Sequence, residues 1–151
     1  MDFIWDVTKE VLDRLGLARS DEMAAKSIGW SNLAKIGAVS GNPQGAHLRI
    51  QAPLCCEILK SEIGAWKPHV VVFHTSDFAR DEILWPSIGA PETWEHSATE
   101  HVWFKNNEIS GCPSIWTIYL GRKSNELWNA VQEATVSQML RVIGSTRLSD
   151  A

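Results

Sequence analysis

The sequence lacks the features that mark several large functional classes. It has no apolar run long enough to span a bilayer and no basic, apolar leader, so we expect a cytoplasmic protein without a membrane partner. No glycine-rich dinucleotide fingerprint or P-loop follows an expected strand, which leaves a doubly wound nucleotide-binding protein little support. Cys55, Cys56 and Cys112 have no spacing typical of a zinc or iron–sulfur site, so we expect reduced thiols and neither a metal nor another cofactor.

Positive charge is also scarce. The formal net charge is −4 at pH 7, whereas proteins that bind nucleic acid through bulk charge are usually basic. Any contact with DNA must therefore come from a local cluster of cations, backbone N–H groups and aromatic rings. The chain has 151 residues, of which 44% are hydrophobic and 21% charged, an ordinary composition for a globular protein. We expect one domain over residues 1–151.

Tryptophan, by contrast, is abundant, with eight residues in the chain. Large side chains that fill a small core account for most of them. An alternative for one or two is that they stack on bases, which aromatic rings do without sequence preference.

Hydrophobic spacing predicts alternating helices and strands. The third helix begins or kinks at Pro53, because proline cannot donate a backbone hydrogen bond. This alternation predicts a three-layer α/β/α fold with a mostly parallel central sheet of about four strands. The expected helices cover residues 3–15, 20–26, 47–66, 77–85 and 124–143, and the expected strands cover 28–33, 69–73, 102–104 and 114–120.

In such sheets ligands bind beyond the carboxyl ends of the strands. That rule selects residues 31–35, 74–77 and 119–123 as the regions where a site is expected.

Three spaced segments carry a family resemblance. They are WSNLAKIG at Trp30–Gly37, the loop GNPQG at Gly41–Gly45, and a helix that runs into Pro68 before the apolar strand HVVVF at His69–Phe73. Together they resemble the uracil-DNA glycosylase superfamily, particularly its short bacterial branches, over about residues 1–125. The resemblance implies a glycosylase-like fold and a protein that binds DNA.

The resemblance also implies residues that hold a base outside the helical stack. Asn32 matches the family's base-reading Asn, and an amide that both donates and accepts can pair with a pyrimidine edge. Ser76, at the expected edge of the sheet, is a second base-binding candidate. Lys35 and Asn42 match the family's Lys and the Asn of its Gly-Asn loop, where they would contact DNA. The alternatives are that Asn32 closes a turn and that the loop is an irregular surface segment.

Two departures from the family concern catalysis. The chain starts inside the helix that should follow the family's water-positioning motif, so we expect a shortened member. Tyr119 and Leu120 stand where the late His-Pro motif belongs. Asp77, just after the central strand, is the candidate carboxylate to stabilise the sugar cation or orient water, and His74 is the candidate donor to the departing base. Alternatively, Asp77 caps the next helix and His74 bonds a backbone carbonyl.

A second cluster suggests DNA contact near the end of the chain. Arg122 and Lys123 precede a helix whose first residue is capped by Ser124, and both the charges and the helix dipole favour a phosphate there. Tyr119 and Trp116 are candidates to wedge or stack beside it. The alternative is a solvated basic turn with core aromatics.

The sequence therefore predicts a DNA glycosylase that flips and excises a pyrimidine and leaves an abasic site. An open pocket, expected from the missing start, favours a modified base, such as a glucosylated pyrimidine of phage DNA, and hence a role in antiviral defence. The alternative is an inactive DNA-binding module that keeps the glycosylase fold.

Overall fold

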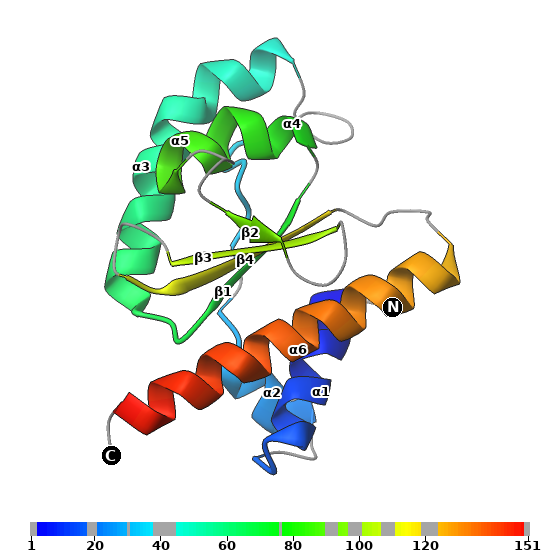
Figure 1. The fold of residues 1–151 in the computed structure, drawn as a ribbon. Helices are drawn as coiled ribbons and strands as arrows, with labels where there is room; N and C mark the ends of the chain where they lie inside the picture. The colour runs from blue at the N-terminus through cyan, green and yellow to red at the C-terminus, as the bar shows by residue number, and fades with distance from the viewer. Residues whose placement is uncertain are drawn as a thin grey trace.

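The computed structural model places helices on both faces of a small sheet (Figure 1). It describes residues 3–17, 21–29, 31–37, 45–75, 77–89, 94–96, 101–106, 111–118 and 124–149. The elements are α1 (Phe3–Arg14), α2 (Asp21–Ser27), α3 (Ala46–Trp66), β1 (Val71–Thr75), α4 (Asp77–Ala79), the π-helical turn η1 (Arg80–Leu84), α5 (Trp85–Ile88), β2 (Glu95–His96), β3 (Val102–Asn106), β4 (Pro113–Ile118) and α6 (Asn125–Ser149).

The sheet has four strands in the order β1-β4-β3-β2, and it is mixed. Only β1 and β4 are parallel, whereas β4 with β3 and β3 with β2 are antiparallel. The expectation of a mostly parallel sheet is therefore wrong. The physical reason is connection length: β3 ends at Asn106 and β4 begins at Pro113, and a connection this short joins antiparallel strands, whereas parallel strands need a longer crossover. The parallel pair β1 and β4 is separated by α4, η1, α5, β2 and β3.

The strand expected over residues 28–33 does not form in the described part of that segment. The chain from Ser31 to Ile36 lies beside α3 instead: the Ser31 hydroxyl donates to the Glu62 carboxylate, and Ile36, three residues beyond the expected strand, pairs with Gln51. Gln51 Oε1 accepts a hydrogen bond from the Ile36 N–H at 2.9 Å, and Gln51 Nε2 donates to the Ile36 carbonyl at 3.1 Å. The amide of one glutamine thus pairs with both backbone groups that a neighbouring strand would have paired.

The helices follow the hydrophobic spacing closely. α1, α2, α3 and α6 lie where the sequence predicts them, although α6 extends to Ser149. α3 begins at Ala46, and Pro53 lies inside it with its ring exposed. Among the helices of the described residues, none combines the length and the apolar character needed to cross a membrane.

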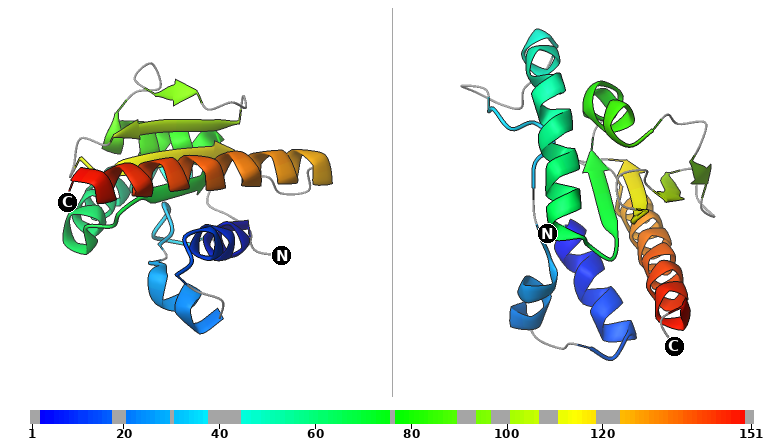
Figure 2. Two further views of the ribbon diagram at one scale, coloured as in Figure 1. Left: turned by 60° about the horizontal axis from the view of Figure 1, so that its bottom comes forward. Right: turned by 90° about the vertical axis from the view of Figure 1, so that its left-hand side faces the viewer.

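Two hydrophobic clusters lie on opposite faces of the sheet (Figures 1 and 2). The first packs α1 and α6 against Val102 and Ile115, and the second packs α3, η1 and α5 against Phe73 and Trp116. Successive side chains of a strand point to opposite faces, so Phe73 and Trp116, which are paired in register, both face α3 and α5. The layered arrangement of helix, sheet and helix is therefore confirmed.

Candidate functional site

The carboxyl end of β1 holds two of the predicted catalytic residues, and the structure separates them. His74 faces α1, because its neighbour Phe73 faces α3. Its Nδ1 lies 2.8 Å from Thr117 Oγ1 on β4, and its ring stacks on Phe3 with centroids 4.5 Å apart. The Phe3 side chain is 2% exposed, so this is a packed, half-buried position in the α1 layer.

Asp77 begins α4 and is exposed, with 75% of its side chain accessible. Its Oδ1 accepts a hydrogen bond from Arg80 Nη1 at 2.8 Å. Arg80 also donates from Nε to Asp81 Oδ1 at 2.7 Å. A single guanidinium thus joins two carboxylates, and its own side chain keeps only 22% exposure.

Arg80 stacks on tryptophan rings as well as pairing with carboxylates. Its guanidinium carbon lies 4.8 Å from the ring centroid of Trp116 and 5.5 Å from that of Trp85. Distances below about 6 Å from a ring centroid are typical of cation–π contacts, which stabilise the charged guanidinium beside the two rings. The π-helical turn η1 places Arg80 and Trp85 on the same side, and such wide turns occur frequently at functional sites.

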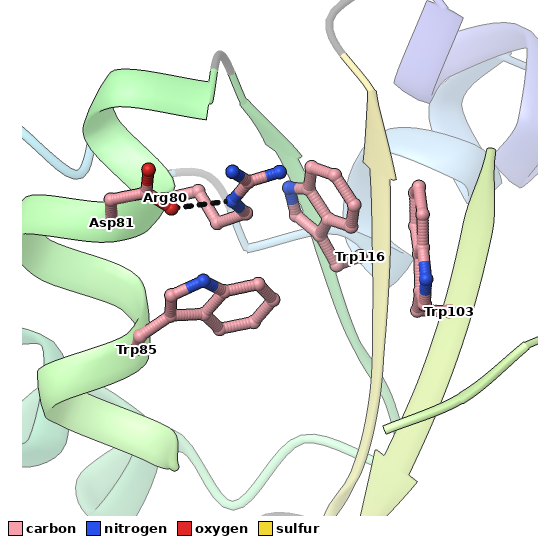
Figure 3. Close-up of a pocket in the computed structure, with 5 residues that line it drawn as sticks. All are labelled: Arg80, Asp81, Trp85, Trp103 and Trp116. Carbon is pink, nitrogen blue, oxygen red and sulfur yellow. Dashed lines mark hydrogen bonds and ion pairs between the residues drawn. The ribbon is translucent and has the colours of Figure 1, made fainter. Parts of the chain in front are cut away.

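The same residues line a pocket of about 320 Å³. Figure 3 shows Trp116 between the Arg80 guanidinium and Trp103, with Trp85 below Arg80. The Trp103 and Trp116 ring centroids are 4.0 Å apart, and those of Trp85 and Trp116 are 5.8 Å apart. Asp81 completes the lining. The volume is at the lower end of the range for small-molecule sites, about 300–1,000 Å³.

Trp103, which lines the pocket, is hydrogen-bonded to the edge strand β2. Trp103 on β3 donates a hydrogen bond from its indole Nε1 to His96 Nε2 on β2 at 3.2 Å. Their rings are in tilted contact, with centroids 5.3 Å apart. Because His96 accepts this bond, the short strand β2 fixes the orientation of a ring that lines the pocket.

Of the other predicted DNA contacts, the structure describes Asn32 and Lys35, and neither lines this pocket. Asn32 is exposed on the segment that runs along α3. Lys35 Nζ lies 2.8 Å from Glu62 Oε2 on α3, so its charge already has a partner. The nearby Ser31 hydroxyl donates to the same carboxylate. Ser76, Asn42, Tyr119, Arg122 and Lys123 lie outside the described residues.

Chemically, the pocket suits a flat ligand that carries polar groups. Trp85 and Trp103 are partly exposed and supply aromatic surface, whereas the buried Trp116 ring lies between Arg80 and Trp103. Arg80 supplies donors and Asp81 supplies an acceptor. Within the described residues no three His, Cys, Asp or Glu side chains gather as a metal site would require. Arg80, Trp85 and Trp103 were not predicted from the sequence, and the abundance of tryptophan is the signal that points toward them.

Comparison of the chain with family models, with curated proteins and with solved structures finds no match. The resemblance to the glycosylase superfamily therefore stays a prediction that rests on the segments quoted from the sequence.

Proposed function

We propose that this chain binds DNA and takes one unstacked base, a modified pyrimidine, into the pocket formed by Arg80, Trp85, Trp103 and Trp116. The observation that carries the proposal is the pocket itself, in which indole faces and a guanidinium meet next to the predicted carboxylate Asp77. Stacking on aromatic rings is the general means by which proteins hold unpaired bases. A base must leave the duplex to be held in this way.

Excision of the bound base is the first of two alternative functions for this site. Asp77 would then act as the carboxylate that stabilises the sugar cation or orients water. It lies at the carboxyl end of β1 and, through Arg80, one hydrogen bond away from the pocket lining. In this reading the chain is a DNA glycosylase of modified phage bases and leaves an abasic site.

Binding without excision is the second function, and two observations favour it. His74, the predicted donor to the departing base, packs against Phe3 on the face opposite the pocket. Asp77 is paired with Arg80, which reduces the charge it can offer to a sugar cation. A chain with these features would recognise an altered base and leave it in place.

The first experiment measures binding of fluorescently labelled single-stranded oligonucleotides by anisotropy. Trp85→Ala should weaken binding about 5- to 150-fold, because stacking on one aromatic ring contributes about 1–3 kcal/mol per base. Trp66→Ala is the matched control, since Trp66 is an exposed tryptophan at the end of α3 and outside the pocket lining. Equal effects of the two variants, or no binding by the unaltered chain, would refute the proposed site.

The second experiment separates excision from binding. The protein is incubated with uracil-containing DNA and, separately, with phage DNA that carries modified pyrimidines, and alkali then converts abasic sites to strand breaks. Excision predicts breaks that Asp77→Asn abolishes while affinity is retained. Measurable binding with no strand breaks on any substrate would identify the chain as a DNA-binding module without excision activity.

A further inference from the structure

The outer side of α3, which lies along one side of the molecule in Figure 1, carries exposed apolar side chains. Ile50 is 80% exposed and Leu54 is 56% exposed, and residues four apart lie on the same face of a helix. Pro53 is exposed between them. Ile36 is 60% exposed and lies beside the same face, because its backbone pairs with Gln51. We call Ile36, Ile50, Pro53 and Leu54 the α3 patch.

The clustering of these residues distinguishes the α3 patch from ordinary surface. Single exposed apolar side chains are normal on soluble proteins, whereas a contiguous apolar patch marks an interaction site. Three of the five large hydrophobic side chains that are exposed among the described residues belong to the α3 patch. The five are Leu17, Ile36, Ile50, Leu54 and Trp66.

Two oppositely charged side chains flank the α3 patch at equal distances from its middle. Arg49 and Glu57 are 65% and 72% exposed, and each is four residues away from Pro53. At a rise of about 1.5 Å per residue they lie about 12 Å apart along the helix axis. Within the chain they form surface ion pairs with Glu82 and Lys60, and such pairs contribute little to stability and can rearrange.

This pattern of charges is self-complementary for two antiparallel copies of α3. A two-fold axis near Pro53 brings Arg49 of each copy opposite Glu57 of the other, so that the contact contains two ion pairs. The same axis brings Ile50 of each copy near Leu54 of the other. A parallel arrangement would instead set Arg49 beside Arg49 and Glu57 beside Glu57, and like charges repel.

We propose that the α3 patch is the interface of a homodimer, in which a second copy of this chain packs its own α3 antiparallel on the first. Exclusion of water from the apolar side chains drives the association, and the two ion pairs fix its direction. A contact formed mainly by one helix of each copy belongs to the small interfaces, so we expect a reversible dimer at micromolar concentrations. None of the patch residues lines the pocket, so the inference does not depend on the proposed function.

Sedimentation equilibrium of the full chain, over about 1 to 200 μM, tests the association. The average mass should rise with concentration from 16.8 kDa toward twice that value. Leu54→Glu should weaken the dimer at least tenfold, because it buries a charge without a partner. Leu17→Glu is the matched control, since Leu17 is 48% exposed but follows α1 and lies outside the α3 patch. A mass of 16.8 kDa at every concentration overturns the inference, as does a dimer that Leu54→Glu leaves intact.

Exchanging the charges tests the antiparallel arrangement. Arg49→Glu and Glu57→Arg each set like charges opposite one another, so each variant alone should lose the dimer at concentrations where the unaltered chain forms it. Mixing the two variants in equal amounts should restore the dimer, because position 49 of each copy then faces an opposite charge at position 57 of the other. A variant that had merely failed to fold could not be rescued in this way. Dimers of either variant as stable as those of the unaltered chain, or a mixture that stays monomeric, overturn the proposed interface.

Discussion

At the scale of single residues, one surface ion-pair group ties the first helix to the last. Arg14 Nη1 donates to Glu133 Oε1 at 3.2 Å and Arg14 Nη2 to Glu133 Oε2 at 2.8 Å, a two-point contact between α1 and α6. Glu10 on α1 accepts a further bond from Arg14 at 2.5 Å. The hydrogen bond from Arg14 lowers the pKa of Glu133, and the bond to Glu133 raises the pKa of Arg14.

The lowered pKa of Glu133 predicts how the free energy of unfolding changes as the pH falls. A carboxyl group whose pKa is lower in the folded chain than in the unfolded chain stabilises the fold above its unfolded pKa, and the contribution disappears as pH falls through the folded pKa. Glu133→Gln should therefore lower the urea midpoint at pH 7. The deficit relative to the unaltered chain should shrink toward zero as the pH is lowered through the range in which carboxyl groups titrate.

The control for this pH series is Glu126→Gln, which alters an exposed carboxylate in the first turn of the same helix. Its midpoint deficit should not follow the same course, because among the described residues Glu126 forms no ion pair with Arg14. A Glu133→Gln deficit that stays constant from neutral to acid pH would show that the Arg14 contact contributes nothing to stability.

At the scale of elements, the end of α3 is formed by an unusual residue. Lys67 adopts the left-handed conformation with φ 46° and ψ 56°, and its N–H donates to the Ile63 carbonyl at 3.0 Å. Glycine is the common residue at this position, because a Cβ is strained there. Pro68 follows directly and prevents the helix from continuing.

Lys67→Gly should therefore stabilise the protein. The strain of a non-glycine residue in this conformation is about 1–2 kcal/mol, and the extra freedom of glycine in the unfolded chain offsets part of it. We expect a net gain of about 0.5–1 kcal/mol in the free energy of unfolding, measured by urea denaturation. Lys67→Ala retains the Cβ and should give no such gain. If Lys67→Gly instead lowered the free energy of unfolding, the exposed Lys67 side chain would stabilise the fold by more than the left-handed backbone destabilises it.

The elements also show what the sequence can and cannot predict. α1 is strongly amphipathic, and α3 and α6 are long helices with apolar residues at helical spacing, so the sequence is sufficient to locate all three. The segment at residues 28–33 has a strand-like composition, but its Ser31 hydroxyl donates to Glu62 of α3, and Gln51 of the same helix pairs with Ile36 just beyond the segment. Both partners lie on another element, beyond a loop. The sequence predicts four strands, and the sheet of the described residues also has four, but the two sets differ. The strand expected at 28–33 is missing, and β2 was not predicted.

The site is less accessible to sequence reasoning than the fold. Trp85, Trp103 and Trp116 come from α5, β3 and β4, and only the pairing of β3 with β4 and the packing of η1 above them bring the rings together. The orientation of His74 is a second example, because the direction of one strand residue follows from the face chosen by its neighbour Phe73. Both depend on tertiary contacts that no local motif encodes.

At the scale of the whole molecule, the two faces of the sheet are packed differently. The face covered by α1 and α6 is closed by Phe3, whose ring stacks on His74 and meets Trp128 edge to face at 5.5 Å. The face toward η1 and α5 holds the pocket, in which Trp116 and Trp85 line a cavity. We therefore expect the first face to determine stability and the second to determine ligand binding.

Phe3→Ala tests this division. Truncating a buried phenylalanine costs about 3–5 kcal/mol, a large part of the roughly 5–15 kcal/mol that stabilises a typical domain, so the urea midpoint should fall strongly. Because Phe3 touches the sheet on the face opposite the pocket, oligonucleotide affinity should stay within about twofold wherever the variant remains folded. Trp85→Ala should behave in the reverse way, with partly exposed Trp85 contributing less to stability and more to affinity. If Phe3→Ala weakened binding in the folded chain as much as Trp85→Ala, the division between the two faces would be wrong. The contact between His74 and Phe3 would then contribute to ligand binding.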